Sequence, residues 1–194
     1  MTALVLGMQF ATSARFGTGA GAGVLDETID HMAPLSQAAI KGVLRDEARW
    51  LLPGQHDTDH PFVAAVFGAD RGAQCPWNFD VHPVEEVKYS RRASIRLDKN
   101  GTVIDGALLV KEEAWIRSAR VEITMRSMLS GGGLPVELAE QECECHLALL
   151  HLSARAAEKV GQRRTRGMGW VAFTCDRSVP DDLDLVWQIR ESVI

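Results

Sequence analysis

Residues 135–176, PVELAEQECECHLALLHLSARAAEKVGQRRTRGMGWVAFTCD, join a long helical pattern to a short apolar one through a loop of glycines and arginines. Apolar residues recur at the three- and four-residue spacing of a buried helix face, at Cys143, Leu147, Leu150, Ala154 and Ala157. Pro135 and Gly161 are typical of a helix start and a helix end. We therefore predict a helix over 135–161, then a loop, then a strand over 170–176.

Outward from this segment, four further stretches show the patterns of regular secondary structure. Residues 3–12 are strongly apolar, as in a buried strand, while residues 118–128 alternate between apolar and polar side chains. Ser36 is a typical N-cap for a helix over 34–52, which a Pro-Gly pair ends. Residues 91–98 alternate toward a strand, and an Asn-Gly turn signal follows them.

The order of these segments is strand, helix, strand, strand, helix, strand. It predicts an α+β fold of the ferredoxin-like (RRM-like) type, βαββαβ, with an antiparallel sheet and both helices on one face. Residues 183–191 predict one more strand-like piece at the end. The prolines and glycines of residues 54–90 predict a long irregular insertion with short pieces of structure, and we expect residues 1–194 to form a single domain.

Composition and charge narrow the class of protein. Hydrophobic residues make up 46% of the chain and charged residues 24%, which is enough for a buried core. No apolar stretch approaches the roughly 20 residues of a membrane helix, and the four cysteines do not suggest a disulfide framework. We therefore expect a soluble, cytoplasmic protein with reduced thiols. The net charge of −5 disfavours general binding to nucleic acid, yet basic residues cluster in 90–96, 117–126 and 159–167.

The glycine-rich stretch RFGTGAGAGVLD, residues 15–26, raises the question of a nucleotide site. A dinucleotide fingerprint needs GxGxxG directly after a strand and opening into a helix, and a P-loop needs Gly-Lys-Ser/Thr. Here the glycines occur at every second position, the predicted helix begins only after Pro34, and no Gly-Lys-Ser/Thr follows. The stretch therefore indicates a flexible or closely approached backbone rather than a nucleotide loop.

Four motifs, in order along the chain, resemble one family. They are IKGVLRDEARWLL (40–52), HPFVAAVFGAD (60–70), RRASIRLDKNGTVIDGALLVKEEAW (91–115) and VGQRRTRGMGWVAF (160–173). Together they resemble the repeat-associated mysterious protein (RAMP) superfamily of CRISPR systems, over most of residues 4–175. Within that superfamily, the chain is most similar to the backbone subunits of type III effector complexes, which bind the guide RNA.

The resemblance implies a function and a set of partners. Members of the family have ferredoxin-like folds and stack side by side along a guide RNA in antiviral ribonucleoproteins. For this chain, the resemblance therefore implies binding to guide CRISPR RNA and complementary target RNA. It also implies contact with other effector subunits, a self-stacking homo-oligomer, and no membrane partner.

The loop of glycines and arginines is the predicted RNA contact, because the family's glycine-rich loop lies against the RNA backbone. Arginine forks suit phosphate oxygens, and glycines let main-chain N–H groups come close. Lys41 and Arg45 are four residues apart on a predicted helix, so both would share one face and extend the basic track. The predicted RNA-binding residues are Lys41, Arg45, Arg163, Arg164, Arg166, Gly167 and Gly169. The competing interpretation is a solvated basic loop.

The resemblance also implies an aspartate between the first strand and the first helix, set against the scissile phosphate of the target RNA. The matching position is Asp26, with Asp30 as the alternative. A lone aspartate, with a reference pKa of about 3.9, is a poor general base near neutrality. It is better suited to ligating a divalent metal such as Mg²⁺, so that a catalytic Asp26 would make the chain a metal-dependent endoribonuclease. A solvated loop acid or an Asx turn is the alternative.

Two departures from the family's pattern bear on these predictions. Ala38 and Ala39 replace paired serines before the Lys-Gly of the first helix. The candidate for the family's projecting thumb hairpin, which kinks the guide–target duplex, is residues 72–90 and is short. The alternatives are a non-catalytic RAMP structural subunit, and a guide-processing endoribonuclease that uses His31, since imidazole suits proton transfer at neutral pH.

Two other groups of side chains invite functional interpretations. Cys143, Cys145, His146 and His151 lie on the predicted long helix and suggest zinc. Cys143 and Cys145 point to different sides of a helix, however, and structural zinc sites usually combine ligand pairs from separate loops, so a core role for Cys143 is favoured. Trp170 directly follows the basic loop and is the tryptophan best placed to stack on a base.

Overall fold

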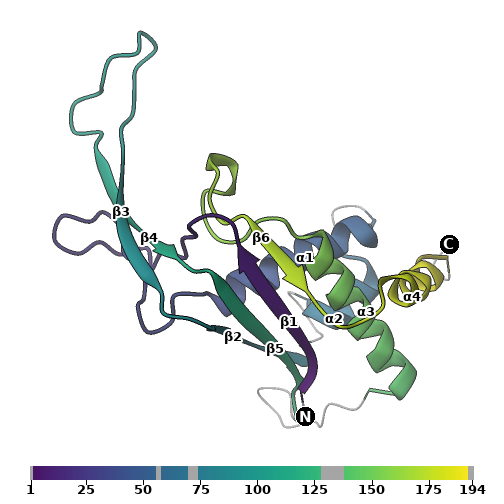
Figure 1. Ribbon diagram of the computed structural model, residues 1–194. Coiled ribbons are helices and arrows are strands. Elements are labelled where there is room, and N and C mark those ends of the chain that lie inside the picture. The colour runs from purple at the N-terminus through teal and green to yellow at the C-terminus, as the bar shows by residue number, and fades with distance from the viewer. Residues whose placement is uncertain (1, 56–57, 70–73, 128–137, 192–194) are drawn as a thin grey trace.

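A four-stranded antiparallel sheet forms the body of the protein, in the order β2-β5-β1-β6 (Figure 1). Its strands are β1 (Thr2–Phe10), β2 (Trp77–Pro83), β5 (Ser118–Met125) and β6 (Val171–Thr174). In β1 the side chains of Leu4, Leu6 and Met8 are buried while those of Val5 and Gln9 are exposed, so one face of the sheet packs into the core. The computed structural model describes residues 2–55, 58–69, 74–127 and 138–191.

Two long helices lie to one side of the sheet and complete a ferredoxin-like fold (Figure 1). α1 (Gln37–Leu51) connects β1 to β2, and α3 (Glu140–Ala156) connects β5 to β6. The predicted N-cap is confirmed, because Ser36 Oγ accepts a hydrogen bond from the Ala39 N–H at 3.2 Å. The predicted α+β, βαββαβ architecture is therefore confirmed. Among the described residues, no helix has the length and apolar character needed to cross a bilayer.

Helix α3 is buried on more than one side. Every residue from 146 to 154 is buried, which includes Leu147, Leu150 and Ala154 of the predicted stripe, while Cys143 is half-buried. The extra burial arises because α3 packs against α1 as well as against α4 (Val179–Glu191). The helix is shorter than the predicted 135–161, and positions 135–137 lie outside the described residues.

The strand-like piece predicted over 183–191 is wrong, because this segment belongs to helix α4. Asp181 and Asp182 lie in its first turn, where carboxylates favour a helix start. Asp182 and Val186, four residues apart, are buried, while Trp187 is exposed. Apolar and polar residues alternate in this stretch of sequence, as in a strand, but the segment is a helix with one narrow buried edge.

The described residues of the segment 54–90, for which we expected an irregular insertion with short pieces of structure, include a complete helix and a complete strand. Helix α2 (Pro61–Phe67) begins with a proline at a position that needs no N–H donor, and β2 follows it. β2 is the second strand of the sheet, so assigning that strand to 91–98 was wrong. The strand has three buried side chains at alternate positions, Trp77, Phe79 and Val81. Its short length between two prolines hid this alternation.

A two-stranded antiparallel hairpin projects from the body (Figure 1). It consists of β3 (Lys88–Ser94) and β4 (Leu109–Trp115). Beyond these strands the chain turns at Asn100 and Gly101, and Gly101 has a φ of +80°, so the predicted Asn-Gly turn is confirmed. The sequence placed the candidate for the projecting hairpin at roughly 72–90, which is wrong, because the described part of that range holds β2 and only the first three residues of β3.

Candidate nucleic-acid interface

The loop after α3 folds back on itself and is tied at its neck to the segment after β1. The Val160 N–H donates to the Gly169 carbonyl (2.9 Å), and the Gly169 N–H donates to the Ser13 carbonyl (2.8 Å). Gly169 has a φ of +73°, and a Cβ there would lie 1.9 Å from the Val160 carbonyl oxygen. Close backbone packing therefore excludes a side chain, which gives Gly169 a structural role independent of any RNA.

The tip of this loop presents arginine side chains to solvent. Arg164 and Arg166 bound a single 3₁₀ turn, η1 (Arg164–Arg166), and both are exposed. Gly167 follows with a φ of +77° and open space where a Cβ would stand. Arg163 precedes the turn with a φ of +56°, and among the described residues it is the only non-glycine residue with a positive φ. The two exposed guanidinium groups are suited to binding phosphate oxygens.

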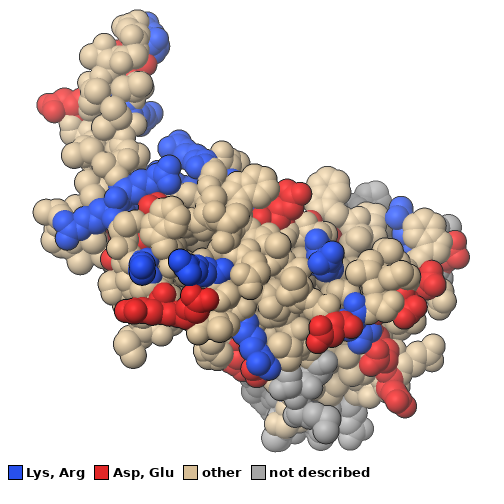
Figure 2. Space-filling model, viewed as in Figure 1, with Lys and Arg blue, Asp and Glu red and all other residues tan. Residues whose placement is uncertain are grey.

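Arg163 lies where the body meets the hairpin, beside basic residues from other segments. Its Nη1 is 3.5 Å from Ser94 Oγ of β3. Burial lowers the pKa of Arg15, and the nearby Glu27 carboxylate opposes this effect. Repulsion from Arg163 and Arg92 lowers the pKa further, because both guanidinium groups lie near that of Arg15. Figure 2 shows Lys and Arg side chains gathered where the hairpin leaves the body. Sequence reasoning noted the basic run around Arg92 but gave it no role, and it missed Arg15.

The glycine-rich loop after β1 is a compact excursion that returns to the hairpin. Gly17 pairs with Ile29 across the loop in an isolated bridge. The returning part runs alongside β4, where the Asp26 N–H donates to the Val110 carbonyl at 2.8 Å. The loop therefore forms part of the base of the hairpin instead of opening into a helix as a nucleotide loop would.

Asp26 is exposed at this base, but one of its carboxylate oxygens is already in use. Oδ2 accepts a hydrogen bond from the Val110 N–H at 2.6 Å. Asp30, the alternative position, accepts from the Met32 N–H at 2.9 Å in an Asx turn. The described segments contain no group of three or more His, Cys, Asp or Glu side chains that could hold a metal ion. Within the described segments, the Asp26 carboxylate therefore belongs to no group of three ligands, and by itself it does not make a complete metal site.

The imidazole ring of His31 makes two contacts with the hairpin, and the His31 carbonyl accepts a hydrogen bond from Tyr89 OH at 3.4 Å. Its Nε2 lies 2.9 Å from Glu112 Oε1, and its ring stacks on Tyr89 with 3.8 Å between the centroids and 10° between the planes. The side chain remains 55% exposed. These contacts of His31 hold the segment after the glycine-rich loop against β3 and β4.

The two basic residues predicted on α1 have different surroundings. Arg45 donates to Asp59 through Nε (2.8 Å) and through Nη2, and Arg49 donates to the same carboxylate at 2.5 Å. Burial alone would raise the pKa of Asp59, but these hydrogen bonds hold the pKa below its usual value. The charge of Arg45 is therefore neutralised within the chain, whereas Lys41 is half-buried on the same helix.

The histidines of α3 are core residues. His146 Nδ1 accepts from the indole N–H of Trp77 at 3.1 Å, and His151 Nδ1 lies 2.6 Å from Asp182 Oδ2. Both imidazoles are 1% exposed. Neither joins the cysteines of the same helix in a metal-binding group in the part of the chain that the structure describes.

Trp170, directly after the loop, contacts a further basic side chain. Lys159 Nζ lies 3.8 Å from the centroid of its ring, which is a cation–π contact. The tryptophan is 39% exposed. One face of the ring is therefore covered by an ammonium group, which adds a positive charge beside the arginine tip.

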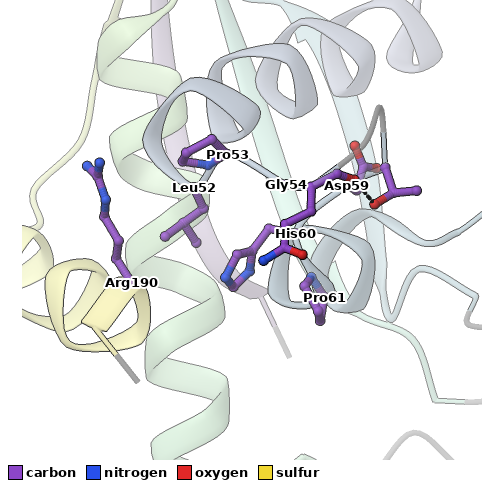
Figure 3. A pocket seen from close by; sticks show the side chains of 9 residues that line it. Leu52, Pro53, Gly54, Asp59, His60, Pro61 and Arg190 are labelled. Atoms are coloured by element: carbon purple, nitrogen blue, oxygen red, sulfur yellow. Dashed lines mark hydrogen bonds between the residues drawn. The ribbon is translucent and has the colours of Figure 1, made fainter. Parts of the chain in front are cut away.

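A separate hollow of about 480 Å³ lies between the end of α1 and α4 (Figure 3). Leu52, Pro53, His60 and Pro61 line it, and Arg190 of α4 lies across from them. Burial lowers the pKa of His60. The described residues that line this hollow include none of the predicted RNA-binding residues, so it is not part of the candidate interface.

Fold and surface together define an α+β, ferredoxin-like protein with a projecting hairpin and a basic junction at the hairpin's base. A chain in the cryo-EM structure of type III-B Cmr-beta in the apo state has this fold, with a TM-score of 0.58 and 10% identity over 92% of this chain and 99% of that chain. A chain of type III-B Cmr-beta bound to cognate target RNA is similar, with a TM-score of 0.55 and 10% identity over 92% and 98%. At this identity the likeness shows a common fold.

Comparisons of sequence alone identify no family for the chain. No protein-family model matches it, and no curated protein is significantly similar to it. The similarity to known proteins therefore lies in the arrangement of strands and helices.

Proposed function

We propose that this protein is an RNA-binding subunit of a type III CRISPR effector ribonucleoprotein that acts in antiviral defence. The observation that carries the proposal is the loop at 160–169, which presents Arg164 and Arg166 at an exposed tip. The fold shared with two chains of type III-B Cmr-beta, one of them in a structure with cognate target RNA, supports it. The proposed ligands are guide CRISPR RNA and complementary target RNA. The proposed partners are other effector subunits and further copies of this chain.

The chemistry of the loop supports binding to the RNA backbone. A guanidinium fork binds two phosphate oxygens without regard to the base, so Arg164 and Arg166 suit contacts that do not depend on sequence. A guide-dependent protein needs such contacts, because base pairing between guide and target supplies the sequence specificity. Local charge, not the overall net charge of −5, decides this kind of binding.

The projecting hairpin supports the same function. The thumb hairpin of the family that the chain resembles kinks the guide–target duplex, and β3 and β4 form a hairpin that projects from the body of this chain (Figure 1). Large apolar side chains are exposed on its outer part, namely Ile95, Leu97, Val103 and Leu108. Apolar side chains can insert between stacked bases and kink a duplex, so we assign the end of the hairpin to the guide–target duplex.

We further propose that the subunit cleaves the target RNA through Asp26. A divalent cation would take one carboxylate oxygen from Asp26 and complete its shell with phosphate oxygens and water. One observation favours the alternative of a non-catalytic structural subunit, because the hydrogen bond to the Val110 N–H gives the carboxylate a structural role. A guide-processing ribonuclease has less support, since Glu112 and Tyr89 already engage the His31 ring.

The salt dependence of RNA binding tests the proposed interface. Arg164 and Arg166 are replaced together by alanine in the full chain, and the affinity for a labelled single-stranded RNA is measured across a series of salt concentrations. The slope of log K against log salt is negative, and each lost single-strand phosphate contact makes it less steep by about 0.7, so we expect a loss of steepness of about 1.4 for two contacts.

A matched control separates this effect from loss of charge in general. Replacing Arg120 of β5 and Arg190 of α4 by alanine changes the net charge by the same amount on other elements. The control should keep the wild-type slope. An unchanged slope in the loop variant would contradict the proposal.

A further inference from the structure

A cluster of charged side chains fills the junction between the body, the glycine-rich loop and the β3–β4 hairpin. We call it the junction cluster, and it consists of Arg15, Arg92, Lys111, Arg163, Glu27 and Glu113. Three of the four cations pair with the two carboxylates, and Arg163 lies beside them in contact with Ser94. Arg15 is 3% exposed and lies against Glu27, whereas the side chain of Arg92 is 53% exposed, so the positive charge in excess of the two carboxylates faces solvent.

Glu27 ties three segments of the chain together within this cluster. Its Oε2 lies 2.7 Å from Lys111 Nζ of β4 and 3.9 Å from Arg15 Nε. Its Oε1 accepts from Gln162 Nε2 at 3.2 Å, and Gln162 Oε1 in turn accepts from Arg15 Nε at 3.1 Å. Gln162 directly precedes Arg163, so these contacts determine where the arginine loop begins relative to the hairpin.

Glu113 has the matching role on the hairpin side. It accepts hydrogen bonds from Ser13 Oγ (3.2 Å), Ser90 Oγ (3.0 Å) and Arg92 Nη1 (3.4 Å). The Arg92 side chain is nevertheless 53% exposed. Its guanidinium group is therefore oriented by Glu113 while it still faces solvent and can bind a ligand.

Arg163 reaches the same place from the arginine loop. It contacts Ser94, which is two residues from Arg92 in β3, so both β3 side chains lie on one face of the hairpin. Arg163 holds its left-handed backbone conformation although it carries a Cβ. Conformations of this kind persist where the surrounding structure imposes them, and they cluster at binding sites.

We propose that Arg92 and Arg163 form a site for one phosphate of the RNA backbone, with Glu27 and Glu113 as positioning residues. This inference rests on the proposed function and adds a contact that lies beside the loop tip. A bound phosphate would neutralise the excess positive charge of the junction cluster, and two guanidinium groups can share its oxygens. The hairpin and the arginine loop would then grip the same point of the RNA.

Binding of a labelled single-stranded RNA to single and double variants of the full chain tests the site. Arg92→Ala and Arg163→Ala should each weaken binding about tenfold, as expected for one charge-assisted hydrogen-bonding group. Each single variant leaves one guanidinium group on the phosphate, so the slope of log K against log salt should become less steep by no more than about 0.7. Because both bind one phosphate, the double variant should be weaker than either single variant by less than tenfold, and its slope should be less steep than that of the wild type by about 0.7 in total. Unchanged binding, or independent effects with a slope change of about 1.4, would overturn the proposal.

Glu27→Gln distinguishes positioning from general electrostatics by the sign of its effect. The substitution makes the chain more positive by one unit, so charge alone predicts tighter RNA binding. Loss of the anchor for Arg15 and Gln162 predicts weaker binding instead, and we expect at least a threefold loss. Glu158→Gln makes the same charge change at an exposed position near Arg164 and should bind equally or more tightly. Tighter binding by both variants would refute the positioning role of Glu27.

The failure of this inference can be told apart from failure of the proposed function. If the wild type does not bind RNA, or if the Arg164 and Arg166 variant binds like the wild type, the proposed function is wrong. If that variant loses binding while Arg92→Ala and Arg163→Ala do not, only the junction site is wrong. Melting temperatures of all variants check the fold, and the half-exposed Arg92 keeps the test available if Glu27→Gln fails to fold.

Discussion

A triad of Arg177, Asp182 and His151 holds the C-terminal helix α4 to α3, and Asp182→Asn should break it. Arg177 donates to Asp182 from Nε (2.9 Å) and from Nη2 (2.6 Å). His151 Nδ1 of α3 lies 2.6 Å from the same carboxylate, whose side chain is 3% exposed. Asparagine keeps the size of the side chain but removes the charge on which all of these contacts depend.

We expect this substitution to lower the free energy of unfolding by about 3 kcal/mol, because removing one partner of a buried ion pair costs about 3–5 kcal/mol. The lower end of the range applies since Arg177 is 23% exposed and keeps Glu144 as a partner. In a chain of this length, the loss corresponds to a fall in melting temperature of about 6–12 °C.

Urea unfolding followed by tryptophan fluorescence and circular dichroism measures the loss. Asp181→Asn is the matched control, because Asp181 is exposed in the same first turn of α4. Both variants lose a similar interaction with the helix dipole, about 0.3–1 kcal/mol, so the difference between them reports the triad. A loss in Asp182→Asn no larger than the loss in Asp181→Asn would refute the reasoning.

Three further predictions concern the hairpin base, the loop and acid pH. In a complex assembled with guide RNA and Mg²⁺, Asp26→Asn should abolish cleavage of the target RNA. RNA binding should stay intact, because asparagine can still accept the hydrogen bond from the Val110 N–H. If the wild-type complex binds the target normally but leaves it uncut, the chain is a non-catalytic subunit. Gly169→Ala should lower the free energy of unfolding by at least about 2 kcal/mol more than Gly167→Ala. Both substitutions place a Cβ on a left-handed backbone, but only position 169 lacks room for it. Equal melting temperatures of the two variants would contradict this prediction. Burial alone would raise the pKa of Asp182, but hydrogen bonds from Arg177 and His151 outweigh burial and lower it. The stabilisation by this carboxylate should therefore be complete above the unfolded-state pKa of about 3.9 and disappear as pH falls through the folded-state pKa. Unfolding free energies of the wild type and Asp182→Asn should converge in acid, and a difference independent of pH would argue against the triad.

Much of the fold was predictable because it follows local patterns. The apolar run of β1, the alternation of β5 and the capped helix α1 each show their structure within about ten residues. The errors occurred where a tertiary partner outweighs the local pattern. α4 has alternating residues yet forms a helix, because Asp182 and Val186 bury its inner edge against the body. β2 was missed because a seven-residue edge strand between prolines carries little signal of its own.

The candidate interface was predictable only in part. The arginines of the loop after α3 were evident, and the structure places two of them at an exposed tip. Arg45 shares the basic character of the loop but donates to Asp59, and no spacing rule identifies that partner. Arg92 was visible within a basic run, but its proximity to Arg163 depends on how the hairpin meets the loop.

The amino-acid sequence by itself determined the order of most elements, the ferredoxin-like class and the basic character of the loop. Periodicity and turn residues act over a few neighbouring positions and can be recognised locally. Only the tertiary structure decided which charges remain available and which are neutralised. Glu27 and Lys111 pair across 84 residues of sequence, because burial and distance in space, not separation along the chain, determine which ions meet.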